Sequence, residues 1–125
     1  MNFDYTQEQQ QFADALRRWI AKDYGFEQRR AIVHGDEGVS GKAWDALVEL
    51  GVTALAMPAS AGGFDGTALD MYIVMEELGR GLVVEPCFAT AMGARFLMLS
   101  GRHEARLEEI AAGRLRLACA LGERQ

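Results

Sequence analysis

The sequence has few of the residues that cross-link small proteins or bind metals. It contains only two cysteines and two histidines among 125 residues, too few for the disulfide framework of a small secreted domain. Cys87 and Cys119 are far apart in sequence and have apolar neighbours, which favours two reduced, buried thiols. His34 and His103 belong to no paired Cys/His or Glu-x-x-His pattern. We therefore expect neither a disulfide scaffold nor a metal site.

Long apolar runs and an excess of positive charge are also missing. No stretch approaches the ~20 apolar residues that span a bilayer, and the first ten residues lack the features of a secretion signal. The net charge is −5 and the pI about 5.0, so there is no electrostatic basis for binding nucleic acid. We expect one cytoplasmic domain that binds neither nucleic acid nor membrane.

Most of the chain consists of apolar or amphipathic segments bounded by helix caps. Thr6 and Gln9 have the spacing of a capping box, as do Thr67 and Asp70. The apolar face that follows Gln9 predicts a helix over residues 7–23. Ser40 is a favourable N-cap, and Gly51 stands where a left-handed C-cap belongs. The same signals predict further helices over residues 26–33, 68–78, 86–99 and 102–112. The expected fold class is all-α.

A glycine cluster, Gly-Gly-Phe-Asp-Gly at residues 62–66, leads into one of these helices. Glycine loops before helices can bind phosphate, but this one has neither dinucleotide-fingerprint spacing nor the lysine of a P-loop. Asp65 and Asp70 add negative charge at the helix N-terminus, where it would repel phosphate. We interpret the loop as a close turn between two helices.

The last twelve residues have a different pattern. Residues 114–117 alternate Arg and Leu before an apolar run, which predicts a strand. A single strand after a series of helices has no partner, so its edge would be open. We expect residues 1–113 to form a helical domain and residues 114–125 to begin a β domain that this chain does not contain.

Residues 49–80 resemble the N-terminal helical domain of acyl-CoA dehydrogenases. The matching elements, in the family's order and spacing, are Glu49-Leu50-Gly51, Pro58, Gly62-Gly63 and Glu76-Glu77-Leu78-Gly79-Arg80. Residues 3–24 are similar to the family's opening helix, and residues 100–121 resemble its passage into the middle β domain. The segments FEQRR and VVEPCFAT further resemble small subunits of two-gene members, such as those acting on pimeloyl-CoA.

The resemblance implies an orthogonal, bundle-like helical domain of a three-domain flavoprotein in fatty acid metabolism. Such enzymes use FAD to oxidise an acyl-CoA thioester to the trans-2-enoyl-CoA, with a glutamate base in the C-terminal part of their chain. The implied partners are an acyl-CoA substrate, the other subunits of a homo- or heterotetramer, and an electron-transfer flavoprotein. No catalytic residue is expected in this chain, so we expect these residues alone to be inactive.

Matched to the family pattern, Val84, Phe88 and Met92 fall along the acyl tail. Their spacing of four residues allows one helical face to present all three. An alternative stays open, in which Phe88 and Met92 only fill the core.

The resemblance also places Cys119, Leu121 and Gly122 at the flavin-contacting segment. The family usually has Thr-Glu-Pro where this chain has Gly122-Glu123-Arg124, and glycine cannot replace the threonine hydroxyl near flavin N5. A second hypothesis is therefore a non-catalytic structural subunit of a heteromeric enzyme. A third is a free-standing helical interaction module, against which the apolar strand expected near the C-terminus argues.

Overall fold

The computed structural model describes residues 4–122, which form six α-helices, one 3₁₀ helix and no strand. The helices are α1 (Gln7–Asp23), α2 (Phe26–Val33), α3 (Gly41–Glu49), α4 (Ala68–Arg80), α5 (Cys87–Ser100) and α6 (Glu104–Ala111), and the 3₁₀ helix is η1 (Ala59–Ala61). This confirms the all-α fold. Within the same residues, no helix is long and apolar enough to cross a membrane.

The expected caps are present at the helix N-termini. Thr6 Oγ1 accepts the Gln9 N–H at 3.1 Å while the Thr6 N–H donates to Gln9 Oε1 at 2.9 Å, and Thr67 and Asp70 form a second capping box before α4. Ser40 Oγ accepts the Ala43 N–H at 3.1 Å. The bounds of α1 and α2 are as predicted. Because each cap is made by residues three apart, the sequence predicts it directly.

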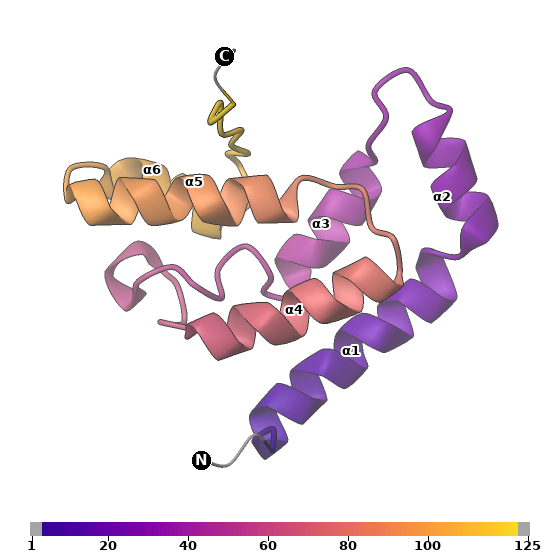
Figure 1. Ribbon diagram of the computed structural model, residues 1–125, viewed down its shortest axis with the longest axis horizontal. Helices are drawn as coiled ribbons and strands as arrows, with labels where there is room; N and C mark the ends of the chain where they lie inside the picture. The colour runs from indigo at the N-terminus through magenta and orange to yellow at the C-terminus, as the bar shows by residue number, and fades with distance from the viewer. Residues whose placement is uncertain (1–3, 123–125) are drawn as a thin grey trace.

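The helices enclose two hydrophobic clusters. In Figure 1, α1 and α4 lie side by side, while α5 lies over α6 on the opposite side of the molecule. The first cluster contains Leu16, Trp44, Leu47, Val52, Val74, Leu78 and Cys87. The second contains Met57, Ala61, Ala94, Leu107, Ile110 and Ala111. Trp44, in the first cluster, also bonds to the chain just after α6, because its Nε1–H donates to the Gly113 carbonyl oxygen at 2.8 Å.

The glycine cluster forms a close backbone turn. A Cβ on Gly63 would lie 2.1 Å from the Met57 carbonyl oxygen, and one on Gly66 would lie 2.5 Å from the Leu55 carbonyl oxygen. The N–H groups of residues 62–66 all donate to carbonyls within residues 54–59. Glycine is therefore required because two chain segments touch, and none of these five N–H groups is left for an anion.

The strand expected over residues 114–125 is absent from residues 114–122, which have no regular secondary structure; residues 123–125 lie outside the described residues. A strand needs a partner for its ladder of hydrogen bonds, and residues 4–122 offer none. The segment lies instead against α5, where the Leu117 N–H donates to Thr90 Oγ1 at 3.1 Å. The proposed domain boundary at residue 113 stays a prediction.

Candidate ligand groove between α4 and α5

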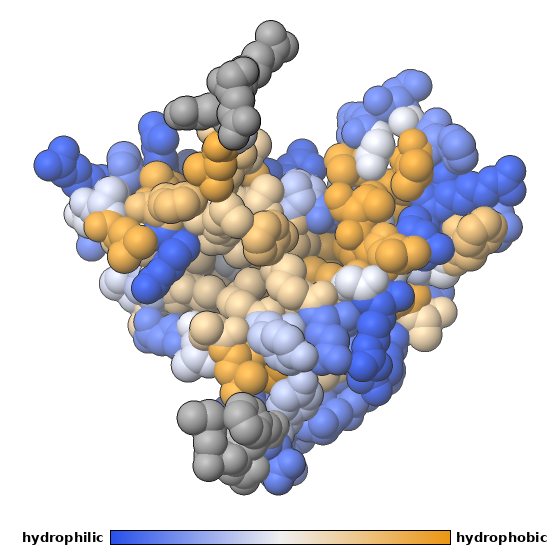
Figure 2. Space-filling model, viewed as in Figure 1, coloured by the Kyte–Doolittle hydropathy of each residue, from blue (hydrophilic) through white to orange (hydrophobic). Residues whose placement is uncertain are grey.

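An apolar groove of about 540 Å³ lies between α4 and α5. Figure 2 shows apolar side chains across the middle of this face, where the surface is hollowed. The groove is lined by Ala56, Met57, Gly66, Thr67, Ala68, Met71, Tyr72, Met75, Phe88, Ala91, Met92, Arg95 and Met98. Five methionines and two aromatic residues make it a flexible apolar surface, because methionine side chains adapt to the shape of a ligand.

The sequence of α4 explains one wall of the groove. Ile73, Val74 and Leu78 are buried in the body of the domain. The helix is apolar on more than this one face, so Met71 and Met75 remain to line the groove. An excess of apolar residues around a helix is expected where a second side is also covered.

A second cavity of about 420 Å³ adjoins the groove and shares Met75 and Phe88 with it. Its other lining residues are Leu78, Gly79, Leu82, Val83, Val84, Glu85 and Cys87. Of the predicted acyl-tail residues, Val84 lies in this cavity, Met92 in the groove and Phe88 in both. Phe88 is 60% exposed, so it does not fill the core.

The residues assigned to the flavin line neither cavity. Cys119 lies against α5, with its thiol 3.7 Å from the Ala89 carbonyl oxygen. Gly93 provides space for the nearby Leu117, since a Cβ on Gly93 would lie 2.9 Å from Leu117 Cδ1. Leu121 and Gly122 are exposed. The structure thus places Cys119 beside α5 but puts none of the three residues in a cavity with Phe88 or Met92.

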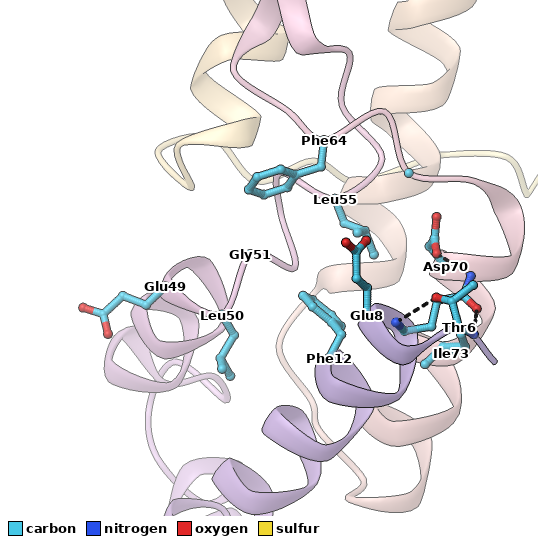
Figure 3. Close-up of a pocket in the computed structure, with 12 residues that line it drawn as sticks. Thr6, Glu8, Phe12, Glu49, Leu50, Gly51, Leu55, Phe64, Asp70 and Ile73 are labelled. Carbon is cyan, nitrogen blue, oxygen red and sulfur yellow. Dashed lines mark hydrogen bonds between the residues drawn. The ribbon is translucent and has the colours of Figure 1, made fainter.

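A larger cavity of about 630 Å³, which sequence reasoning missed, lies at the N-terminal end of α1. Figure 3 shows Phe12, Leu55 and Phe64 around it, with Glu8 between Leu55 and Asp70 and with Glu49 at the edge. Its lining residues come from segments around positions 6–12, 49–55 and 64–73, and no local motif links three such distant segments.

One of the acidic residues that line this larger cavity, Asp70, is a helix cap. Asp70 Oδ1 accepts a hydrogen bond from Gln9 Nε2 at 2.9 Å, and Oδ2 accepts one from the Thr67 N–H at 2.7 Å. Burial raises the pKa of Asp70, but the bonds from Gln9 and Thr67 outweigh burial and hold it below its usual range. Residues 4–122 contain no cluster of three or more His, Cys, Asp or Glu that could hold a metal ion.

Two solved structures with this fold are each named for a pair of proteins. The domain superposes with a TM-score of 0.86 on a chain of the Tcur3481–Tcur3483 steroid ACAD G363A variant, at 24% identity, covering 94% of this chain and 33% of that one. It superposes with a TM-score of 0.85 on a chain of the ChsE4–ChsE5 complex from Mycobacterium tuberculosis, at 20% identity, covering 99% of this chain and 36% of that one. At these identities the likeness shows the fold.

Curated relatives give closer sequence matches. Acyl-CoA dehydrogenase IpdE2 of Mycobacterium tuberculosis is 33% identical over 109 residues, which are 86% of this chain and 34% of the relative. Acyl-CoA dehydrogenase FadE28 of the same organism is 35% identical over 91 residues, 72% of this chain and 21% of the relative. This chain therefore spans about a third or less of their length.

The sequence profile of the family "Acyl-CoA dehydrogenase, N-terminal domain" matches residues 6–114, nearly the whole helical part of the structure. Together with the helical fold and the relatives, this match confirms the resemblance drawn from residues 49–80. The chain belongs to the acyl-CoA dehydrogenase N-terminal domain family.

Proposed function

We propose that the full-length protein is a subunit of a FAD-dependent acyl-CoA dehydrogenase, in which this domain forms one wall of the acyl pocket. The observation that carries the proposal is the groove between α4 and α5, with Phe88 and Met92 facing an apolar α4. Its volume of about 540 Å³ lies in the range of small-molecule sites. Each acyl methylene buried there would contribute about 0.8 kcal/mol.

The groove supports binding and not the chemical step. None of its lining residues is a carboxylate, a histidine or a cysteine, so it lacks the side chains that most often act as a general base. We place the base, and most flavin contacts, in the part of the protein outside this chain. The 125 residues alone should therefore not oxidise an acyl-CoA when FAD is added.

The segment around Cys119, Leu121 and Gly122 is our proposed contribution to the flavin site. The backbone groups of residues 120–122 form no hydrogen bond within residues 4–122, so they fit polar atoms of a bound group. Gly122 has open space on its Cβ side and no hydroxyl to donate. When bound, FAD supplies the acceptor for the β-hydride; this segment would only hold and orient it.

A heteromeric assembly with bulky substrates fits the comparisons best. The two structural neighbours are each named for a pair of proteins, and one is named a steroid ACAD. We propose a cytoplasmic heterotetramer that takes a polycyclic acyl-CoA and passes electrons to an electron-transfer flavoprotein.

The proposal that Phe88 forms part of the acyl-pocket wall is tested with Phe88→Glu in the full-length protein, purified with its partner subunit. A charge in the apolar groove should lower kcat/KM for long or polycyclic acyl-CoAs by about tenfold or more and affect short esters less. Phe26→Glu on α2, at a position 64% exposed, is the matched control. Unchanged preference for acyl size in Phe88→Glu would exclude Phe88 from the wall.

Gly122 favours a second candidate, a subunit that retains the fold but holds no flavin. Flavin content separates the two possibilities. One FAD per copy of this chain, measured by absorbance of the purified full-length complex, supports the catalytic subunit. Loss of all FAD on removal of the partner supports the structural one.

A further inference from the structure

Two apolar cavities of the domain meet at one pair of side chains. The groove of about 540 Å³ and the second cavity of about 420 Å³ share Met75 of α4 and Phe88 of α5 among their lining residues. Within residues 4–122, every other residue that lines them belongs to one cavity alone. Because Met75 and Phe88 come from the two helices that form the groove, this pair stands between the cavities and divides them.

The side chains of this pair are free to move, whereas the residues behind them are fixed. Phe88 is 60% exposed and belongs to neither hydrophobic cluster. Met75 is half-buried, and its unbranched side chain adapts to its surroundings. Behind the pair, Leu78 and Cys87 are buried in the first cluster. Exposed side chains change rotamer within nanoseconds, so the passage between the cavities can widen without a change in the backbone.

The second cavity suits a hydrocarbon rather than a polar group. Glu85 is the only charged residue lining it, but this residue is 4% exposed and its Oε2 accepts the Ser40 N–H at 2.8 Å. Cys87 is a neutral thiol near neutral pH, because burial raises its pKa to about 12. The other side chains that line the cavity are apolar: Met75, Leu78, Leu82, Val83, Val84 and Phe88.

The charge on the groove gives a ligand its direction. Arg95 is the only charged residue lining the groove and is exposed; it forms no ion pair within residues 4–122. It lies about two helical turns beyond Phe88 along α5, away from the second cavity. A cation at this end suits the phosphates of coenzyme A, so the distal end of an acyl group points toward Phe88.

We propose that Met75 and Phe88 form a movable partition that sets which acyl groups the domain accepts, an inference that rests on the proposed function. A short acyl group occupies the groove alone. A larger one turns the Phe88 ring aside and places its distal end in the second cavity, against Leu82 and Val84. Each further methylene buried there would strengthen binding about fourfold.

The test uses the full-length protein with its partner subunit and two probes of different size, octanoyl-CoA and the CoA thioester of cholanic acid. Calorimetry gives the ratio of their affinities. Phe88→Ala and Met75→Ala should each raise this ratio at least about fivefold in favour of the cholanoyl ester. The larger group then has no partition to displace, while octanoyl-CoA loses a contact. Phe26→Ala, the same change at a position 64% exposed that lines neither cavity, should keep the wild-type ratio.

Filling the second cavity should have the opposite effect. Val84→Phe adds bulk at a residue that lines this cavity alone, so it should weaken binding of the cholanoyl ester about tenfold more than binding of octanoyl-CoA. Met92→Ala shortens a residue that lines the groove alone. It should weaken binding of both esters by similar factors.

The outcomes separate this inference from the proposed function. A ratio within about twofold of wild type in both Phe88→Ala and Met75→Ala overturns the partition and leaves the groove as an acyl site. Equal weakening of the two esters in Val84→Phe also overturns it, because the distal end would then lie elsewhere. Binding of neither ester by the wild-type complex contradicts the proposed function itself. If one variant of the pair does not fold, the other decides.

Discussion

At the scale of single residues, a buried carboxylate and its one cationic partner join α1 to α4. Glu77 is 4% exposed, and Arg17 binds both of its oxygens, with Nη2 to Oε1 at 2.6 Å and Nε to Oε2 at 3.2 Å. A planar guanidinium suits this two-point contact. Without Arg17 the carboxylate would remain buried and unpaired.

Arg17→Ala should therefore lower the free energy of unfolding, because it leaves the buried Glu77 carboxylate without the guanidinium that binds both of its oxygens. Urea unfolding followed by circular dichroism measures the loss. Arg18→Ala changes an exposed arginine on the same helix and should stay within about 0.5 kcal/mol of wild type. Equal effects of the two substitutions would show that the Arg17 contact contributes little.

Gly63 is a residue whose missing side chain matters. Gly63→Ala would place a methyl group 2.1 Å from the Met57 carbonyl oxygen, so the turn must open, at a cost of about 2 kcal/mol or more. Gly41→Ala, at a helix position with open space, should be neutral or stabilise by up to about 1 kcal/mol. Thermal melts of both variants test this, and a wild-type melting temperature for Gly63→Ala would contradict the close turn.

At the scale of elements, the N-terminus of α4 depends on an ionised cap. The pKa of Asp70 is lowered, so the folded state favours the charged carboxylate. Its contribution is fully present above the unfolded-state pKa of about 3.9 and is lost as the pH falls through the lower folded-state value.

We expect Asp70→Asn to destabilise the protein by about 1 kcal/mol at pH 7 and to match wild type at the lowest pH at which both fold. Unfolding free energies measured across pH 2 to about 7 test this. Asp45→Asn, on an exposed position of α3, should show no such convergence. If the difference in unfolding free energy between wild type and Asp70→Asn did not change with pH, the charge of Asp70 would not be what stabilises the cap.

At the scale of the whole molecule, α5 presents more apolar surface than its own domain covers. Phe88, Phe96 and Leu99 are 60%, 51% and 70% exposed, and single-domain proteins seldom leave such a row of large apolar side chains in water. The matched region makes up 34% of IpdE2 and 21% of FadE28, so proteins of this family have further residues available to cover such a surface.

The 125 residues expressed alone should therefore bind a hydrophobic dye such as ANS and self-associate, whereas the full-length complex should not. A double change, Phe96→Gln with Leu99→Gln, should reduce dye binding by about half, in proportion to the apolar surface removed. Arg102→Gln, an exposed polar change just beyond the same helix, should have no effect. Weak dye binding by the isolated wild-type chain would contradict the prediction that α5 exposes an apolar surface which the rest of the protein covers.

The order and type of the helices, and most of their ends, followed from the sequence by itself. Thr6 with Gln9, and Thr67 with Asp70, lie within one helical turn of each other, so the capping bonds were readable from spacing. The family was equally readable, because its motif occupies one continuous stretch around residues 49–80. Local physical rules suffice for features of this kind.

Only the tertiary structure decided the rest, because it depends on contacts between residues far apart in the chain. The strand expected near residue 117 required a partner strand. The alternation of Arg and Leu that predicted it says nothing about whether such a partner is present. From the sequence alone, the apolar face of α5 could equally have been part of the core. The packing of the helices leaves Phe88 exposed. The groove exists only because α4 and α5 lie against each other. Which side chains are buried there depends on how the helices pack, and no single segment determines it.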